Sequence, residues 1–488
     1  MHIRTYALAA TVAATVAAAV TAGLTLAPTA VAAQPSPTTS DFNGDGYADL
    51  AVGVPDGAVD GKAKAGYVNV VWGGPKGLGS RGSIRVSQAT AEVPGSPEAG
   101  DRFGASAVLE DLNGDGIAEL LAGAPGEDVT DRGVDAGMVT VVGGARGGPS
   151  HGSTALTGPA ASAAYGGSVA AADLTGDGSR DIVIGGRDKV VLRTADGILT
   201  TVLTAPMGGR APILATGDFT ADGTADLALA YWTVDAPFTQ SHVRLWAWDA
   251  AEEGMANTWN TDNAGVSALA AGDFDGDGND DLALGECREI ADENIDDPCG
   301  PEEFAKGGGI HVHYGSGPDG SFGYRAQTIG QDTVGVPGVA ETGDRFGASL
   351  AVADVNRDGR DDLVAGAPGE AIGTRAGAGA ATLLFGGATG LVDADGEGHS
   401  VAYNQGTPRV PGAAEAGDAF GAAVATGDYD HDGRPDIAVG SPGENAKSGG
   451  VWVLPRASAD GSYTVTPTKL GLPAASSALA YGQTLSSH

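Results

Sequence analysis

Apolar residues in this chain occur in short runs rather than at the three- and four-residue spacing of an amphipathic helix. Small and β-branched residues make up runs at 106–109 and 120–124, and Gly and Pro bound them. A further run follows, as in GYVNVVWGG (66–74), GMVTVVGG (137–144), GIHVHYG (309–315) and GGVWVLP (449–455). The pattern predicts an all-β protein built from repeated groups of about four strands, of which the last is the least regular.

A nine-residue stretch rich in Asp and Gly separates the first two strands of each group. It occurs seven times, as DFNGDGYAD (41–49), DLNGDGIAE (111–119), DLTGDGSRD (173–181), DFTADGTAD (218–226), DFDGDGNDD (273–281), DVNRDGRDD (354–362) and DYDHDGRPD (428–436). We call these acidic loops 1 to 7. Their starts are 70, 62, 45, 55, 81 and 74 residues apart, so the repeating unit is a strand block with variable insertions.

The acidic loops have the composition of a Ca²⁺ site. Alternate oxygen-bearing side chains bent round a glycine bring several hard ligands to one point, and such ligands suit Ca²⁺. We expect ligands from the side chains at positions one, three, five and nine and from the backbone carbonyl at seven. These side chains are Asp41, Asn43, Asp45 and Asp49; Asp111, Asn113, Asp115 and Glu119; Asp173, Thr175, Asp177 and Asp181; Asp218, Thr220, Asp222 and Asp226; Asp273, Asp275, Asp277 and Asp281; Asp354, Asn356, Asp358 and Asp362; and Asp428, Asp430, Asp432 and Asp436.

Position three distinguishes the loops from one another. Asp275 and Asp430 supply a fourth carboxylate, whereas Thr175 and Thr220 offer only a hydroxyl. Because the charge of the ligands sets affinity, we expect up to seven structural Ca²⁺ ions, bound most weakly in loops 3 and 4. The alternative is a set of Asp- and Gly-rich turns without metal.

Two further motifs flank several of the loops. An aromatic-glycine pair stands eight residues before the loop, as Phe103-Gly104, Tyr165-Gly166, Phe346-Gly347 and Phe420-Gly421. A Gly-x-Pro turn follows the loop, as GVPD (53–56), GAPGE (123–127), GAPGE (366–370) and GSPGE (440–444). In this order the motifs resemble the FG-GAP repeat family, whose best-known members are the β-propellers of integrin α subunits. The fourth and fifth units lack both motifs and resemble the family through their loops alone.

The resemblance implies one seven-bladed β-propeller of four-stranded blades over 34–488, with Ca²⁺ loops that stiffen the blades on one rim. Loop 1 has no aromatic-glycine pair before it, but YGQTLSSH (481–488) ends the chain with such a pair and no loop. We predict that this C-terminal strand completes blade 1 and closes the ring. The expected blades span about 41–92 with 481–488, then 101–160, 163–208, 211–262, 265–330, 344–405 and 418–470.

The N-terminus predicts secretion. A basic start, a long apolar run and a small-residue cleavage site make 1–33 a secretory signal peptide, with an uncleaved membrane anchor as the alternative. We expect a bacterial, extracellular protein without membrane insertion after cleavage, with cell-wall attachment left open. In this oxidising compartment Cys287 and Cys299 are expected to form a disulfide. The net charge of −35 disfavours nucleic acid as a partner.

Two features are candidates for partner binding. The segments VPGSPEAGDRFG (93–104), VPGVAETGDRFG (336–347) and VPGAAEAGDAFG (410–421) are close copies, which the resemblance places on the rim opposite the loops. They are either structural turns between blades or a ligand-facing rim, with contacts from Arg102, Arg345, Glu98, Glu341 and Glu415. Trp246 and Trp248 alternate along a strand and share a face, either packing between blades or gripping a partner.

The resemblance favours a monomeric, non-catalytic binding or adhesion module for an extracellular protein or glycan. We assign no catalytic residue. The alternative is a propeller-type secreted hydrolase or polysaccharide lyase, since related propellers accompany phospholipase and lyase activities. Such a lyase needs a cluster of Arg, Lys, His or Tyr at the central channel.

Overall fold

The computed structural model describes residues 40–235, 238–262, 265–285, 307–315, 321–472 and 479–486. The chain divides into two compact units, Met1–Ser36 and Pro37–His488, and every described residue belongs to the second. The expected signal peptide and the expected disulfide between Cys287 and Cys299 lie outside the described residues. No helix in the described ranges is long and apolar enough to span a membrane.

The described strands form seven four-stranded antiparallel sheets, as the repeat pattern predicts. From the inner to the outer strand, the first three sheets are β28 (Thr484–Leu485), β1 (Leu50–Val54), β2 (Tyr67–Val71) and β3 (Ser83–Val86); β4 (Ser106–Glu110), β5 (Glu119–Ala124), β6 (Met138–Gly143) and β7 (Gly152–Thr157); and β8 (Ser168–Ala172), β9 (Asp181–Gly185), β10 (Lys189–Arg193) and β11 (Leu199–Thr204).

The fourth and fifth sheets are β12 (Ile213–Gly217), β13 (Asp226–Asp235), β14 (Phe238–Asp249) and β15 (Gly254–Asp262), then β16 (Ala268–Gly272), β17 (Asp281–Gly285), β18 (Ile310–His313) and β19 (Ala326–Ile329). The last two are β20 (Ser349–Ala353), β21 (Asp362–Ala367), β22 (Ala380–Leu384) and β23 (Ser400–Tyr403), then β24 (Ala423–Gly427), β25 (Asp436–Ser441), β26 (Gly450–Leu454) and β27 (Tyr463–Val465). One short helical turn, α1 (Glu444–Lys447), precedes β26, and the 3₁₀ turn η1 (Pro455–Ala457) follows it.

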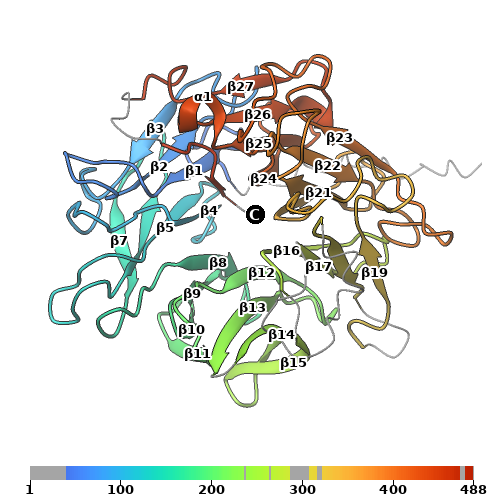
Figure 1. The fold of residues 1–488 in the computed structure, drawn as a ribbon. Helices are drawn as coiled ribbons and strands as arrows, with labels where there is room; N and C mark the ends of the chain where they lie inside the picture. Colours follow the sequence, from blue (N-terminus) through green and yellow to red (C-terminus); the bar gives the residue numbers. More distant parts are fainter. Residues whose placement is uncertain are drawn as a thin grey trace, which may run out of the picture. The chain divides into compact units, whose positions relative to one another are not determined.

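The seven sheets are the blades of a β-propeller. The inner strands β4, β8, β12, β16, β20, β24 and β28 contact one another in sequence, and β28 contacts β4 (Figure 1). Buried apolar side chains fill the space between neighbouring blades, as where Phe420, Val439 and Trp452 of blade 7 pack with Val364 and Leu383 of blade 6. The core is therefore a ring of inter-blade layers.

The aromatic-glycine and Gly-x-Pro motifs meet across each junction that carries both. The Gly421 backbone has a φ of +87°, and its carbonyl oxygen would lie 2.0 Å from a Cβ placed on Gly366 of the preceding blade. The preceding Phe420 is fully buried and makes a parallel bridge with Gly379. Only glycine allows two backbones to approach this closely, so this pair of glycines sets the spacing between blades 6 and 7.

The C-terminal strand closes the ring, as predicted. Strand β28 pairs with β1 through Thr484 and Leu485. Tyr481 is fully buried and donates a hydrogen bond from its hydroxyl to Asn69 Oδ1 at 2.7 Å. Gly482 lies against Gly440 of blade 7, so the last aromatic-glycine pair makes the same contact as those of the other blades.

Blade 4 differs from the other blades in the length of its strands. Strands β13 and β14 are 10 and 12 residues long, whereas most second and third strands have five or six. Trp246 and Trp248 are half-buried and pack on a cluster that includes Val190 and Leu192 of blade 3. Their shared face therefore packs against the neighbouring blade.

Candidate calcium loops and the two rims

The acidic loops occupy one rim because each joins the first and second strands of its blade. The Gly-x-Pro turns join the second and third strands and so lie at the other end of the antiparallel sheet. The connection between blades starts from the end of the fourth strand, which places it on that second rim too. We call these the loop rim and the turn rim.

The first aspartate organises the backbone of its own loop. In loop 5, Asp273 Oδ1 accepts hydrogen bonds from the Gly276 and Asp277 backbone N–H groups at 2.7 and 3.0 Å. Its Oδ2 accepts one from Gly278 N–H at 2.9 Å. Gly278 has a φ of +90°, which favours glycine at the sharp turn at position six. The corresponding bonds to the first Asp recur in the other loops.

The ninth residue of every loop is a buried carboxylate. Asp49, Asp181, Asp281 and Asp362 are fully buried, and Glu119, Asp226 and Asp436 are at most 7% exposed. Asp281 Oδ1 accepts a hydrogen bond from Gly315 N–H at 2.8 Å, which ties loop 5 to the end of β18. Burial, with a smaller contribution from the other carboxylates of the same loop, raises the pKa of Asp49 and Asp281 to about 8. A bound divalent cation would offset both costs, since it favours the ionised form.

The donor atoms fit a hard, oxygen-seeking cation. Asp273, Asp275 and Asp281 bring three carboxylate oxygens within 4.8 Å of one another, and Asp428, Asp430 and Asp432 do the same. At position three of loops 3 and 4, the Thr175 and Thr220 hydroxyls are buried beside the ninth-position carboxylates of Asp181 and Asp226. Oxygen atoms in these positions suit Ca²⁺. FG-GAP repeats of integrin-like propellers typically bind this ion.

Three arginines from outside the loops form ion pairs with loop carboxylates, and sequence reasoning missed all three. Arg81 Nη1 lies 2.5 Å from Asp45 Oδ2 of loop 1, and Arg325 Nη2 lies 2.5 Å from Asp275 Oδ2 of loop 5. Arg456 Nε forms an ion pair with Asp432 of loop 7. Each arginine comes from the connection between the third and fourth strands of the same blade, 24 to 50 residues after its partner. No motif near either partner in the sequence predicts these ion pairs.

Three junctions on the turn rim each hold a buried glutamine beside a glutamate. The Nε2 atoms of Gln88, Gln331 and Gln405 donate hydrogen bonds of 2.5 Å to Glu127, Glu370 and Glu444. Each glutamate ends a Gly-x-Pro-Gly-Glu turn, and each glutamine stands five residues before a Val-Pro-Gly copy. The repetition of the glutamine with the copied segments was a signal available in the sequence.

The arginines proposed as ligand contacts are exposed on the turn rim. Arg102 and Arg345 both have a left-handed backbone, with φ values of +58° and +61°. Arg102 Nε lies 3.9 Å from Asp56 Oδ1. Glu98 and Glu341, in the same copied segments, are also exposed.

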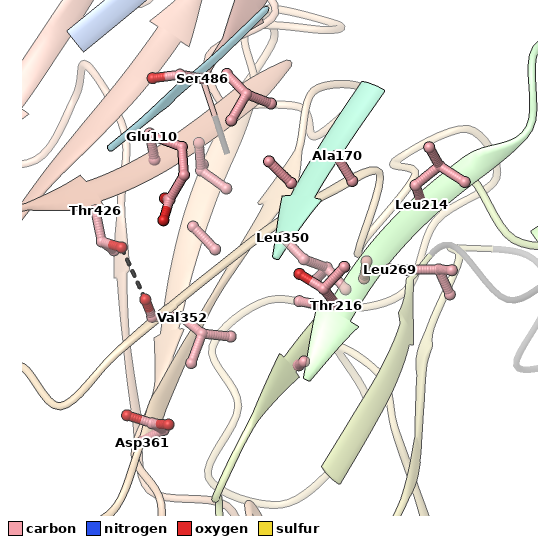
Figure 2. A pocket seen from close by; sticks show the side chains of 18 residues that line it. Glu110, Ala170, Leu214, Thr216, Leu269, Leu350, Val352, Asp361, Thr426 and Ser486 are labelled. Atoms are coloured by element: carbon pink, nitrogen blue, oxygen red, sulfur yellow. Dashed lines mark hydrogen bonds between the residues drawn. The ribbon is translucent and has the colours of Figure 1, made fainter. Parts of the chain in front are cut away.

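A central cavity of about 300 Å³ lies among the inner strands (Figure 2). Aliphatic side chains such as Leu214, Leu269 and Leu350 line much of it, and Glu110, Asp361, Thr216, Thr426 and Ser486 supply its polar groups. Thr426 donates a hydrogen bond to the Val352 carbonyl at 2.8 Å. The described lining residues include none of the Arg, Lys, His or Tyr side chains that the lyase alternative requires, so this cavity gives that alternative no support.

Comparison with known proteins identifies the repeats. The FG-GAP repeat matches residues 34–71, 103–142, 346–384 and 420–454. The chain is 32% identical over 259 residues to integrin alpha pat-2 of Caenorhabditis briggsae, covering 49% of this chain and 18% of that protein. It is 38% identical over 117 residues to the phosphatidylinositol-glycan-specific phospholipase D of Rattus norvegicus, covering 22% and 13%.

These relatives are much longer than their matched parts, and the chain spans at most 18% of their length. Among solved structures, the Photorhabdus luminescens Tc holotoxin pore matches 78% of this chain and 16% of that chain, at 15% identity and a TM-score of 0.34. That likeness is too weak to bear on fold or function. The repeats and the sheet topology together make this chain a seven-bladed β-propeller with FG-GAP repeats in four places, similar over about half of its length to part of an integrin α subunit.

Proposed function

We propose that the protein is a secreted, calcium-stabilised module that binds an extracellular protein or glycan without catalysing a reaction. The observation that carries the calcium part is the recurrence of one oxygen-rich loop, seven times on one rim, with a buried carboxylate at its ninth position in every copy. An ion that stabilises the scaffold is expected at an equivalent place in every blade, and the loop between the first and second strands is such a place. Integrin-like FG-GAP proteins are commonly extracellular, which agrees with the expected signal peptide.

Calcium acts on the scaffold rather than on a substrate. Each loop offers oxygens at four side-chain positions and one backbone carbonyl, which leaves few open places on the ion for Lewis-acid chemistry. The ion neutralises carboxylates that repel one another in a chain with a net charge of −35. The expected weakest sites remain loops 3 and 4, where threonine stands at position three.

The partner binds on the turn rim. The three copied segments present exposed charged side chains there, including Arg102 and Arg345 on blades 2 and 6 and Glu415 before blade 7. Exposed, preorganised loops on a rigid scaffold are common binding elements. Attachment to the cell wall through such a partner and a monomeric state in solution both belong to this proposal.

Capture of extracellular proteins and glycans on the immobilised chain, in Ca²⁺ and in chelator, tests the proposal. Hits are then compared between wild type, Arg102→Glu/Arg345→Glu, and Arg146→Glu, an exposed change on the loop rim. We expect a hit that requires Ca²⁺, weakens at least tenfold in the double variant and persists in Arg146→Glu. Binding that is lost in both variants, or in neither, contradicts a site on the turn rim. Turnover of a captured glycan contradicts the non-catalytic assignment.

A further inference from the structure

The ion pairs on the loop rim divide the seven acidic loops into two groups. Loops 1, 5 and 7 each have an arginine on a carboxylate that is an expected ligand. Among the described residues, no arginine from elsewhere in the chain forms an ion pair with the expected ligands of loops 2, 3, 4 and 6. The loops therefore differ in local charge beyond what their own residues set.

Arg325 is held in place by three contacts. Its Nη2 donates to Asp275 Oδ2 at 2.5 Å, and its Nη1 donates to the Thr389 carbonyl of blade 6 at 2.6 Å. Its guanidinium carbon lies 3.5 Å from the centre of the Tyr314 ring, which is fully buried. Asp275 itself is only 8% exposed at its side chain. The positive charge is thus fixed beside loop 5 rather than free in solvent.

Arg456 holds the equivalent place at loop 7. It pairs with Asp432, whose side chain is 19% exposed, while its own backbone N–H donates to Asp436 Oδ1 at 2.8 Å. Loops 5 and 7 are also the two with aspartate at position three. At each of these loops the four expected ligand carboxylates and the paired arginine sum to −3, which equals the charge of the three expected ligand carboxylates of loop 2.

We infer that Arg325 and Arg456 lower the calcium affinity of loops 5 and 7 and so bring these four-carboxylate sites close to the other loops. This inference rests on the proposed calcium binding. Each guanidinium occupies one oxygen of a ligand carboxylate and places a positive charge at ion-pair distance from that carboxylate. Both effects oppose a second cation, because like charges repel strongly where the site is partly dehydrated. The arginines are positioning residues that set affinity and are not ligands.

The opposite effect, in which the arginine raises the calcium affinity, also has a clear physical basis. An arginine bonded to one oxygen of a ligand could hold that carboxylate in its binding orientation, as partners of metal ligands often do. Removal of the arginine would then weaken the site. The direction of the affinity change therefore decides between the two roles.

Calcium titration of the whole chain by calorimetry tests the inference, with the metal itself as probe. Arg325→Gln is expected to tighten one class of site about tenfold, equivalent to about 1.4 kcal/mol. Arg325→Lys keeps the charge and should stay near wild type. The matched control is Arg193→Gln, at the loop-rim end of β10, since Arg193 forms no ion pair with another described residue.

A double-variant cycle locates the effect. In an Asp273→Asn background, which replaces the first carboxylate ligand of loop 5 by a neutral amide and so weakens calcium binding there, Arg325→Gln should no longer tighten any site in the titrated range. Arg456→Gln, with Asp428→Asn as its background, repeats the test at an arginine whose side chain is 59% exposed and whose loss the fold tolerates more readily. Unchanged or weaker affinity, or a gain that persists in the Asn backgrounds, overturns the inference. If wild type takes up no calcium at millimolar concentration, the proposed calcium binding falls with it, and the wild-type titration alone reveals this.

Discussion

Glu127 on the turn rim is an acid held in a buried, mainly acidic environment. Its pKa is raised to about 7, mainly by burial; Asp101, Glu98 and Asp128 also raise it, and the hydrogen bond from Gln88 partly offsets these effects. Glu127 is only 8% exposed, so water solvates its charged form poorly. Glu370 and Glu444 stand at equivalent junctions, and burial raises their pKa values too.

Glu127→Gln should make the protein less sensitive to pH. The folded-state pKa of about 7 lies above the ordinary 4.5, so the folded chain binds more protons between these values. The unfolding free energy therefore falls as pH rises from about 4.5 to 7, by up to about 3 kcal/mol from this group. Urea denaturation should show the variant gaining stability relative to wild type between pH 5 and pH 8. Exposed Glu253→Gln is the control, and an equal difference at both pH values contradicts the prediction.

At the scale of the strand, the contact between the two motif glycines explains why the repeat has its form. A Cβ on Gly421 would lie 2.2 Å from the Ala380 carbonyl oxygen, and one on Gly366 would lie 2.0 Å from the Gly421 carbonyl oxygen. Any side chain at these places would push blades 6 and 7 apart.

Two glycine variants separate this close approach from backbone strain. Gly421 and Gly417 have φ values of +87° and +85°, but only Gly421 lacks room, since nothing lies within 4 Å of a Cβ on Gly417. We expect Gly417→Ala to cost about 1 kcal/mol from the left-handed backbone alone. Gly421→Ala should cost about 2–5 kcal/mol, because overpacking adds to the strain. Equal losses in thermal melts would show that the inter-blade contact has no special weight.

The C-terminal strand is a second test at this scale. Deletion of residues 481–488 removes β28 and the buried Tyr481, so the melting temperature should drop sharply. Tyr481→Ala alone should cost about 3–5 kcal/mol, as for other buried aromatic residues. Tyr481→Phe, which loses only the bond to Asn69, should cost about 1 kcal/mol. An unchanged melt after the deletion contradicts a stabilising role for closure.

At the scale of the whole molecule, stability depends on the proposed ions. Calcium that binds only the folded chain should raise the unfolding free energy by about 1.4 kcal/mol per site at ten times its dissociation constant. The melting temperature should therefore be highest in Ca²⁺, lower in Mg²⁺ and lowest in chelator, since Mg²⁺ fits flexible many-oxygen sites poorly. A melt unmoved by chelator contradicts the structural role of the loops.

The repeated loops and motifs determined the fold class, the blade number and the closure by 481–488. These features follow from local chemistry, because strand periodicity, turn glycines and acidic spacing are all written within a few residues. Blade 4 shows the limit of such signals, since its long β13 and β14 carry no motif that sets their ends.

Tertiary structure alone decided which distant side chains meet. Arg325 reaches Asp275 because the third and fourth strands of a blade reconnect beside its loop, 50 residues along the chain. Gln88 reaches Glu127 because neighbouring blades pack face to face, which brings their loops together on the turn rim. Both contacts depend on the path of the backbone through space, and no spacing within a single repeat encodes it.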